Sequence, residues 1–123
     1  MATVQLTKES FESTVANNDI VLIDFWASWC APCRIFAPVY EAASESHEGV
    51  VFAKVDTEAE QELASAFGIM SIPTLMAFRD QILLYSQPGA LPSAGLEDLI
   101  GKVKALDMDE VRRSIAERAP AQA

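Results

Sequence analysis

Two cysteines, Cys30 and Cys33, are the only thiols in the chain, and two residues separate them. Side chains three positions apart on a helix share one face, close enough for a disulfide bond to join two thiols. The flanking sequence predicts that a strand gives way to a helix at this point. Two thiols at such a junction indicate reversible dithiol–disulfide chemistry.

The two thiols are predicted to have different roles. Cys30 lies at the expected start of the helix, where unpaired N–H groups and the helix dipole stabilise a thiolate. Cys33 lies one turn inside and is expected to be less exposed. We therefore assign Cys30 as the attacking thiol and Cys33 as the resolving thiol. Pro32 suits the first helical turn, where its missing N–H costs no hydrogen bond.

Two other interpretations of the cysteine pair are weaker. A structural zinc site needs four ligands, and His47 is the only histidine that could join the two cysteines, so no metal site is expected. An inert structural disulfide would close a very short loop and would therefore gain little stability. Because both alternatives are weak, dithiol–disulfide exchange is the favoured chemistry.

Charged residues lie inside two otherwise apolar segments. Asp24 interrupts a predicted strand just before the thiols, and burial would raise its pKa enough for proton exchange near neutral pH. The alternative is that Asp24 lies at an edge and only accepts hydrogen bonds. Lys54 alternates with apolar neighbours, which by itself is typical of a solvated lysine. Trp26 could be a core residue, whereas Trp29 is the better candidate for a surface contact.

Apolar periodicity predicts the elements that position these residues. Strands are expected at residues 4–6, 20–26, 50–56, 74–78 and 82–85, and helices at 8–16, 30–46, 58–67 and about 96–103. Alternating strands and helices imply parallel strands, and the hairpin that closes the series adds antiparallel ones. The predicted fold class is α/β, a three-layer sandwich around a mixed sheet.

The chain is predicted to be one domain, residues 1–106, followed by a C-terminal extension, residues 107–123. The extension should form a short helix from about Asp107 to Arg118 and then a frayed tail. Its apolar stripe could pack on the domain or contact a partner; the stripe consists of Met108, Val111, Ile115 and Ala119.

Composition excludes several functional classes. The formal net charge of −9 argues against non-specific binding of nucleic acid and against docking on anionic membranes. The sequence has no recognisable secretory signal and no apolar run of the ~20 residues that span a bilayer. Two cysteines are too few for a disulfide scaffold. These features favour a soluble, cytoplasmic protein, and we expect it to be a monomer.

The motifs together resemble the bacterial type of the thioredoxin family over roughly residues 4–106. The residues that carry the resemblance are Phe25-Trp26-Ala27-Ser28-Trp29-Cys30-Ala31-Pro32-Cys33-Arg34, Pro38, Gly68, Ile72-Pro73-Thr74, Phe78 and Gly89-Ala90. The resemblance implies the thioredoxin fold and a protein-disulfide reductase, a thiol–disulfide oxidoreductase that reduces client proteins. It also implies recycling by an NADPH-dependent thioredoxin reductase. No bound cofactor is expected, because the cysteines carry the electrons.

The same resemblance implies roles for residues outside the cysteine pair. Asp24 matches the family's buried carboxylate, which exchanges a proton with the inner thiol, and Lys54 matches a lysine beside it. Pro73 matches a cis-proline that faces the disulfide and helps to hold the substrate chain. The residues expected to contact substrate are Trp29, Ala31, Pro32, Ile72, Gly89 and Ala90.

Several positions depart from the family pattern. Ala31 replaces the usual glycine between the cysteines, which leaves the reduction potential open, whereas Arg34 keeps the charge of a common lysine. Met70 stands where a charged residue is frequent, so the docking surface is expected to be more apolar. Gln81 falls where the hairpin usually has glycine, and a positive φ there would cost ~1–2 kcal/mol.

Two alternative functions remain open at the level of sequence. The apolar rim of the groove (Trp29, Met70, Ile72 and Ala90) could serve a redox-sensitive binding module, a holdase or a subunit of a larger complex. The same cysteine pair could also run in the opposite direction, as a dithiol oxidase or an isomerase, which a raised reduction potential would favour.

Overall fold

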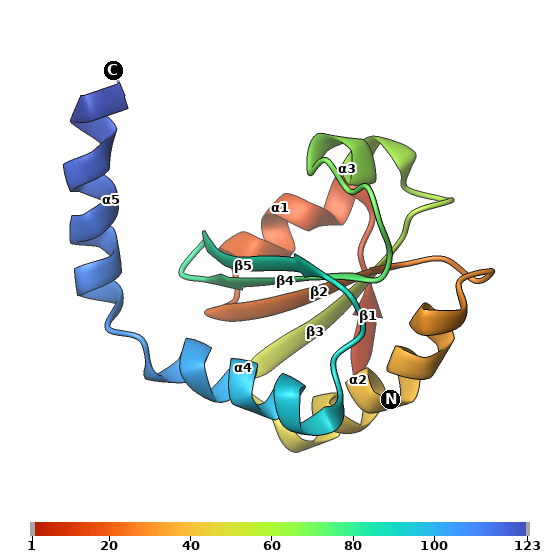
Figure 1. Ribbon diagram of the computed structural model, residues 1–123. Coiled ribbons are helices and arrows are strands. Elements are labelled where there is room, and N and C mark those ends of the chain that lie inside the picture. The colour runs from red at the N-terminus through yellow and green to blue at the C-terminus, as the bar shows by residue number, and fades with distance from the viewer. Residues whose placement is uncertain (1, 123) are drawn as a thin grey trace.

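A mixed five-stranded sheet forms the centre of the computed structural model, which describes residues 2–122 and their side chains as far as Arg118 (Figure 1). The strands are β1 (Thr3–Gln5), β2 (Ile20–Trp26), β3 (Val50–Asp56), β4 (Thr74–Arg79) and β5 (Ile82–Pro88). Their order across the sheet is β1-β3-β2-β4-β5. Strand β3 runs parallel to β1 and β2, whereas β4 is antiparallel to both β2 and β5. The predicted mixed sheet is thereby confirmed.

Helices cover both faces of the sheet, which confirms the three-layer arrangement. In the view of Figure 1, α1 (Lys8–Ala16) and α3 (Gln61–Ala66) lie above the sheet, and α2 (Ala31–Ser46) and α4 (Ser93–Ala105) lie below it. Strands β2 and β3 are joined through α2, and β3 is followed by α3 before the antiparallel hairpin. Such crossovers are what parallel neighbours require.

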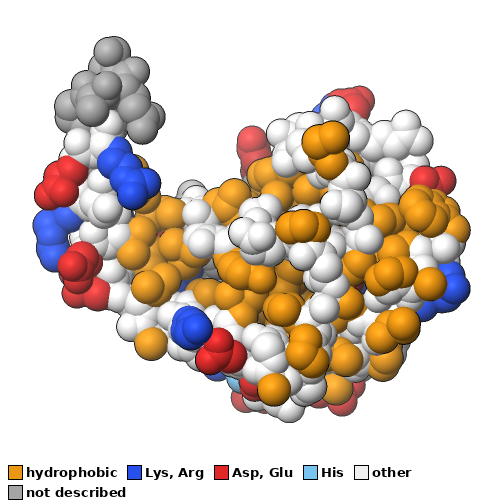
Figure 2. Space-filling view, viewed as in Figure 1, with side chains coloured by type: hydrophobic (Ala, Val, Ile, Leu, Met, Phe, Trp, Pro, Cys, Tyr) orange, Lys and Arg blue, Asp and Glu red, His pale blue; other side chains and the backbone are white. Residues whose placement is uncertain are grey.

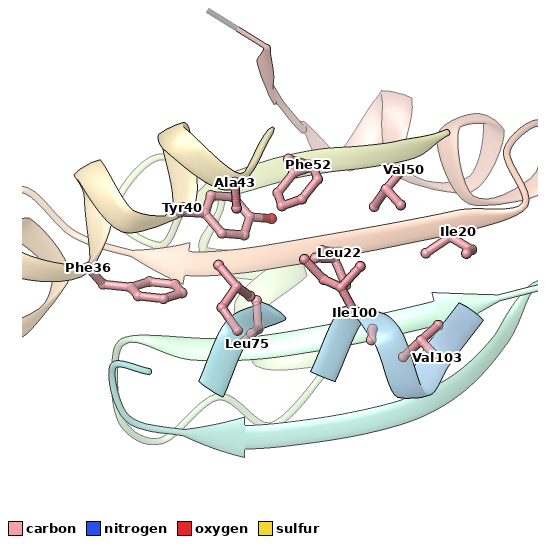
Figure 3. Packing of buried hydrophobic residues seen from close by; sticks show 12 residues of the cluster. Ile20, Leu22, Phe36, Tyr40, Ala43, Val50, Phe52, Leu75, Ile100 and Val103 are labelled. Carbon is pink, nitrogen blue, oxygen red and sulfur yellow. The ribbon is translucent and has the colours of Figure 1, made fainter. Parts of the chain in front are cut away.

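Strand β2 is apolar on both faces because both faces are buried. Ile20 and Leu22 point into the cluster between the sheet and the helices α2 and α4, which Figure 3 shows from close by. Val21, Ile23 and Phe25 belong to the cluster on the opposite face, together with side chains of α1 and α3. Since side chains alternate along a strand, Asp24 lies on the same face as Leu22, the face that α2 covers.

Most element boundaries differ from the prediction by one or a few residues, and for two of them the structure shows the cause. Helix α3 begins at Gln61 rather than at residue 58, because the side chain of Asp56 accepts the N–H of Glu58 and its backbone carbonyl accepts that of Glu60. These bonds hold residues 56–60 in a turn. Strand β5 continues to Pro88 rather than ending at Tyr85, because residues 86–88 pair with the first residues of β4.

The β4–β5 turn has a left-handed backbone conformation, which residues with a Cβ atom rarely adopt. Asp80 and Gln81 both have positive φ, 52° and 68°. Two consecutive residues of this kind suit a two-residue hairpin, because the twist of the turn then matches that of the strands. Gln81 therefore carries the steric cost, ~1–2 kcal/mol, that a glycine would avoid.

The C-terminal helix α5 (Met108–Gln122) stands away from the sheet (Figure 1). Met108 is buried and Val111 is half-buried, whereas Ile115 is 46% exposed. The Arg112 guanidinium donates a hydrogen bond to Asp80 in the β4–β5 turn. The helix continues past the predicted end at Arg118 to Gln122, so the backbone of residues 119–122 is helical where a frayed tail was expected.

The molecular surface is unevenly charged. Figure 2 shows that apolar side chains cover much of the face in view, whereas charged side chains are concentrated on α4, on α5 and around the margin. Within residues 2–122, no helix combines the length and the apolar character that crossing a membrane requires.

Candidate active site

A disulfide bond joins Cys30 and Cys33 at the N-terminus of α2. Their Cα atoms are 5.2 Å apart, which lies within the ordinary range for a bridge. Cys30 is the N-cap residue, with an extended backbone that leads from the end of β2 into the helix. The predicted strand-to-helix junction thus places both sulfurs in the first turn.

The backbone environment, rather than exposure, distinguishes the two sulfurs. Both cysteines are buried in this disulfide form, with 4% of Cys30 and 3% of Cys33 exposed. The Sγ atom of Cys30 accepts the backbone N–H of Cys33 at 3.2 Å. Because that amide and the positive end of α2 point at Cys30, negative charge is better accommodated on its sulfur.

A cis peptide bond joins Ile72 to Pro73 directly beside the disulfide. The carbonyl oxygen of Ile72 lies 3.7 Å from the Sγ atom of Cys30. The backbone N–H of Gly89 donates to the carbonyl of Pro73 at 2.8 Å, and Gly89 has a φ of 107°, which suits a residue without Cβ. The fold therefore places the Ile72–Pro73 peptide next to Cys30 and joins Gly89 to Pro73 by a backbone hydrogen bond.

Asp24 is a buried carboxylate in the centre of the sheet. Only 1% of the residue is exposed, and neither carboxylate oxygen has a hydrogen-bond partner among the described residues. Burial raises the pKa of Asp24 from 3.8 to about 7, although the positive charge of Lys54 opposes the shift. The alternative that the sequence left open, an Asp24 at an edge that only accepts hydrogen bonds, is therefore wrong.

Lys54 lies next to Asp24 and is partly covered by an aromatic ring. The two residues are register partners in the β2–β3 ladder. The Lys54 Nζ atom lies 4.9 Å from the centre of the Trp26 ring, a geometry in which the ring stabilises the cation. Lys54 and Cys33 also line one small pocket of about 90 Å³.

An apolar pocket of about 180 Å³ opens beside the disulfide loop. It is lined by Trp29, Thr57, Ala64, Ile69, Met70, Ser71 and Ile72. Two of the predicted substrate-contacting residues, Trp29 and Ile72, are among these lining residues. The other four, Ala31, Pro32, Gly89 and Ala90, are exposed and do not line this pocket.

Two contributions to the site were not predicted from the sequence. Trp26 covers Lys54, whereas its sequence context favours only a core position; its spacing of two from Asp24 on one strand is the signal that the two side chains share a face. Thr57 contributes to the Trp29 pocket, and both its backbone N–H and its hydroxyl bond to the carbonyl of Trp26. No short sequence pattern marks that second contact.

Acidic and metal-ligating side chains do not gather at the site. Across the described part of the chain, no group of three or more His, Cys, Asp or Glu side chains could hold a metal ion. The chemistry available at the site is therefore that of two sulfurs, one buried carboxyl group and one ammonium group.

Comparison with known proteins agrees with this geometry. The family model described as Thioredoxin matches residues 2–102. Putative thioredoxin 2 of Streptomyces coelicolor is 61% identical over 117 residues, 95% of this chain and 87% of the relative. Thioredoxin of Bacillus subtilis is 39% identical over 103 residues, 83% of this chain and 98% of the relative. A mutant thioredoxin structure from Halobacterium salinarum superposes with a TM-score of 0.78 at 33% identity and covers 85% of this chain and 92% of that one.

Proposed function

The chain belongs to the thioredoxin family, and we propose which of its residues carry out each step of the reaction. It is a thiol–disulfide oxidoreductase that acts as a protein-disulfide reductase. The observation that carries the proposal is the Cys30–Cys33 disulfide at the N-terminus of α2, beside the cis peptide before Pro73. The disulfide is the oxidised end of the cycle, and the dithiol is the form that attacks clients.

In the first step the Cys30 thiolate attacks one sulfur of a client disulfide. A bond forms between Cys30 and that sulfur, the client's S–S bond breaks, and the second client sulfur leaves as a thiolate. The Cys33 amide, which donates to the Cys30 sulfur, and the dipole of α2 support the attacking charge. Exposed residues of the rim, Trp29 among them, hold the client chain next to the buried Pro73 during this step.

In the second step Cys33 resolves the mixed disulfide. Its thiol first loses a proton, which Asp24 accepts, because a buried carboxyl with a pKa of about 7 is ready to take up a proton near neutral pH. The Cys33 thiolate then attacks Cys30, and the client leaves with its second cysteine reduced. Lys54, beside Asp24 and on the same pocket as Cys33, moderates both charges.

Recycling completes the cycle. The oxidised pair needs two electrons and two protons, and we assign their supply to an NADPH-dependent thioredoxin reductase. The cysteines, Asp24, Lys54 and Pro73 all come from one chain, which supports action as a monomer. Such a donor works where the thiol pool is kept reduced, so we place the protein in the cytoplasm.

Reduction of insulin tests the proposed function. With NADPH and a competent thioredoxin reductase, the purified chain should consume NADPH in proportion to the insulin disulfides reduced. The double variant Cys30→Ser with Cys33→Ser is the matched control and should show only the background rate. No turnover by the unaltered chain under these conditions would contradict both the reductase activity and the proposed recycling.

Residues 107–123 are proposed to be an extension that the redox reaction does not need. In Figure 1, α5 lies on the side of the molecule opposite the N-terminus of α2. The matched family model stops at residue 102, although the similarity to the Streptomyces relative covers 117 residues and so reaches α5. The extension nevertheless contacts the domain through Met108 and Arg112.

Truncation after Leu106 should lower stability but not activity. Loss of the buried Met108 side chain should cost about 2 kcal/mol of unfolding free energy, and the exposed Arg112–Asp80 pair less than about 1 kcal/mol. Urea unfolding measures the change in stability, and the insulin assay measures the activity. Met108→Ala in the full chain should reproduce most of the loss, whereas Arg112→Ala should not. A truncated chain with reduced insulin turnover would contradict the proposal.

A further inference from the structure

Met70 combines extreme exposure with a position at the active-site rim. Its residue is 95% exposed, more than Trp29 at 65% or any other large hydrophobic residue in the described part of the chain. Met70 follows the half-buried Ile69 and lies two residues before Ile72, whose carbonyl adjoins Cys30. A flexible thioether is therefore presented to solvent two residues before the carbonyl group that adjoins the reacting sulfur.

Two pockets meet at the Met70 segment. One is the pocket of about 180 Å³ that Trp29 and Ile72 line, and the other, of about 170 Å³, reaches toward the ends of β4 and β5. The second is lined by Phe67, Gly68, Ile69, Met70, Ser71, Thr74, Ser86 and Pro88. Neither lining contains a charged side chain, although the chain as a whole has a net charge of −9. A client that docks here exchanges water for an uncharged, mainly apolar surface.

We propose that Met70, which is exposed in the disulfide form, is a reversible oxidation site through which peroxide weakens the docking of client proteins on the rim. The inference rests on the proposed function, because it concerns the same docking surface. The thioether sulfur donates an electron pair to one oxygen of hydrogen peroxide. An S–O bond forms, the O–O bond breaks, and the second oxygen leaves as water after proton transfer. Methionine is oxidised by two electrons to its sulfoxide, and peroxide is reduced.

The structure makes this oxidation selective. Met76 is 2% exposed and Met108 is 6% exposed, so a peroxide molecule reaches their sulfurs poorly. Cys30 and Cys33 are joined to each other in this form and offer no thiolate. Met70 is thus the most accessible oxidisable sulfur among the described residues.

The product changes the character of the rim. A sulfoxide adds a strong hydrogen-bond acceptor to a side chain that lines both pockets. When a client covers the rim, that oxygen loses its water, and the uncharged lining offers few donors in exchange. We expect the KM for a protein client to rise about tenfold. A small aromatic disulfide, which needs little of the rim, should react at an unchanged rate.

The test uses the full oxidised chain, treated with hydrogen peroxide and freed of excess reagent. Peptide mass mapping should find one added oxygen on Met70 and none on Met76 or Met108. The insulin assay should then show the raised KM with little change in kcat. Two methionine sulfoxide reductases, one for each epimer of the sulfoxide, should together restore the original KM when dithiothreitol drives them and is removed before the assay.

Two variants separate the position of the sulfur from general oxidative damage. Met70→Leu keeps the volume of the side chain but has no thioether, so peroxide should leave its KM unchanged. Adding Ile115→Met to that variant places an oxidisable sulfur on α5, away from the rim, and its oxidation should also leave the KM unchanged. An equal loss in wild type and Met70→Leu would overturn the proposal, as would a fully oxidised Met70 with an unchanged KM.

The proposed function is checked first in the same experiment. Failure of the untreated chain to reduce insulin contradicts the reductase function itself. Normal turnover that oxidation of Met70 does not alter contradicts only the role of Met70.

Discussion

Replacement of Cys33 by serine should abolish catalytic turnover while leaving client proteins covalently bound to Cys30. The Cys30 thiolate still attacks, because the donor at its sulfur is the backbone N–H of residue 33, which serine retains. The second step lacks its nucleophile, so the mixed disulfide persists. Insulin turnover should fall by several orders of magnitude, as expected when a nucleophile is removed.

Non-reducing electrophoresis and mass spectrometry of the trapped adducts measure this effect. Cys30→Ser is the matched control: Cys33 is then the remaining thiol, it is buried, and it lacks the N-terminal position in α2, so few adducts should form. Adducts on Cys30→Ser as abundant as those on Cys33→Ser would contradict the assigned roles of the two thiols.

Replacement of Asp24 by asparagine should change how the stability of the oxidised protein depends on pH. The pKa of Asp24 is raised from 3.8 to about 7 in the folded protein, chiefly by burial. Above pH 7 the folded protein must hold a buried carboxylate, whereas below pH 3.8 the group is protonated in both states. Between these limits the unfolded chain binds fewer protons than the folded one, so stability falls as pH rises.

The expected size of the effect follows from the shift. A raise from 3.8 to about 7 corresponds to a destabilisation on the order of 4 kcal/mol, fully present above pH 7 and absent below pH 3.8. Asparagine keeps the shape but does not titrate, so its own cost of burial is the same at every pH. The unfolding free energy of wild type minus that of Asp24→Asn should therefore decrease by about this amount between pH 4 and pH 8.

The measurement is urea unfolding of wild type and of Asp24→Asn, each in the disulfide form, across that pH range. Glu12→Gln removes an exposed carboxylate of α1 and should show no comparable change. A difference between wild type and Asp24→Asn that stays constant with pH would mean that Asp24 titrates alike in the folded and unfolded chains. Its part in proton transfer to and from Cys33 would then lose its physical basis.

The central strand illustrates what local sequence predicts well. Ile20–Trp26 is almost continuously apolar, and such a run is compatible only with burial on both faces. The structure confirms it as β2, flanked by β3 and β4, with the two clusters on its two faces. The boundaries of α3 and β5 were less predictable, because they depend on bonds from Asp56 and on pairing with β4 rather than on periodicity.

Asp24 and Lys54 illustrate what local sequence leaves open. From spacing alone, Asp24 could have been an edge residue and Lys54 a solvated one. Their adjacency follows from the parallel register of β2 and β3, and the burial of Asp24 also requires α2 to cover that face. The position of Lys54 further depends on the Trp26 ring.

The sequence by itself determined the fold class, the dithiol chemistry and the order of the elements. Each of these rests on local spacing: two residues between thiols, alternation along strands, and periodicity along helices. Only the tertiary structure decided that Asp24 is buried without hydrogen-bond partners among the described residues, that Gly89 bonds to Pro73, and that Met70 is exposed between two pockets. The physical reason is that burial and proximity between distant residues depend on strand order and packing, which local spacing does not encode.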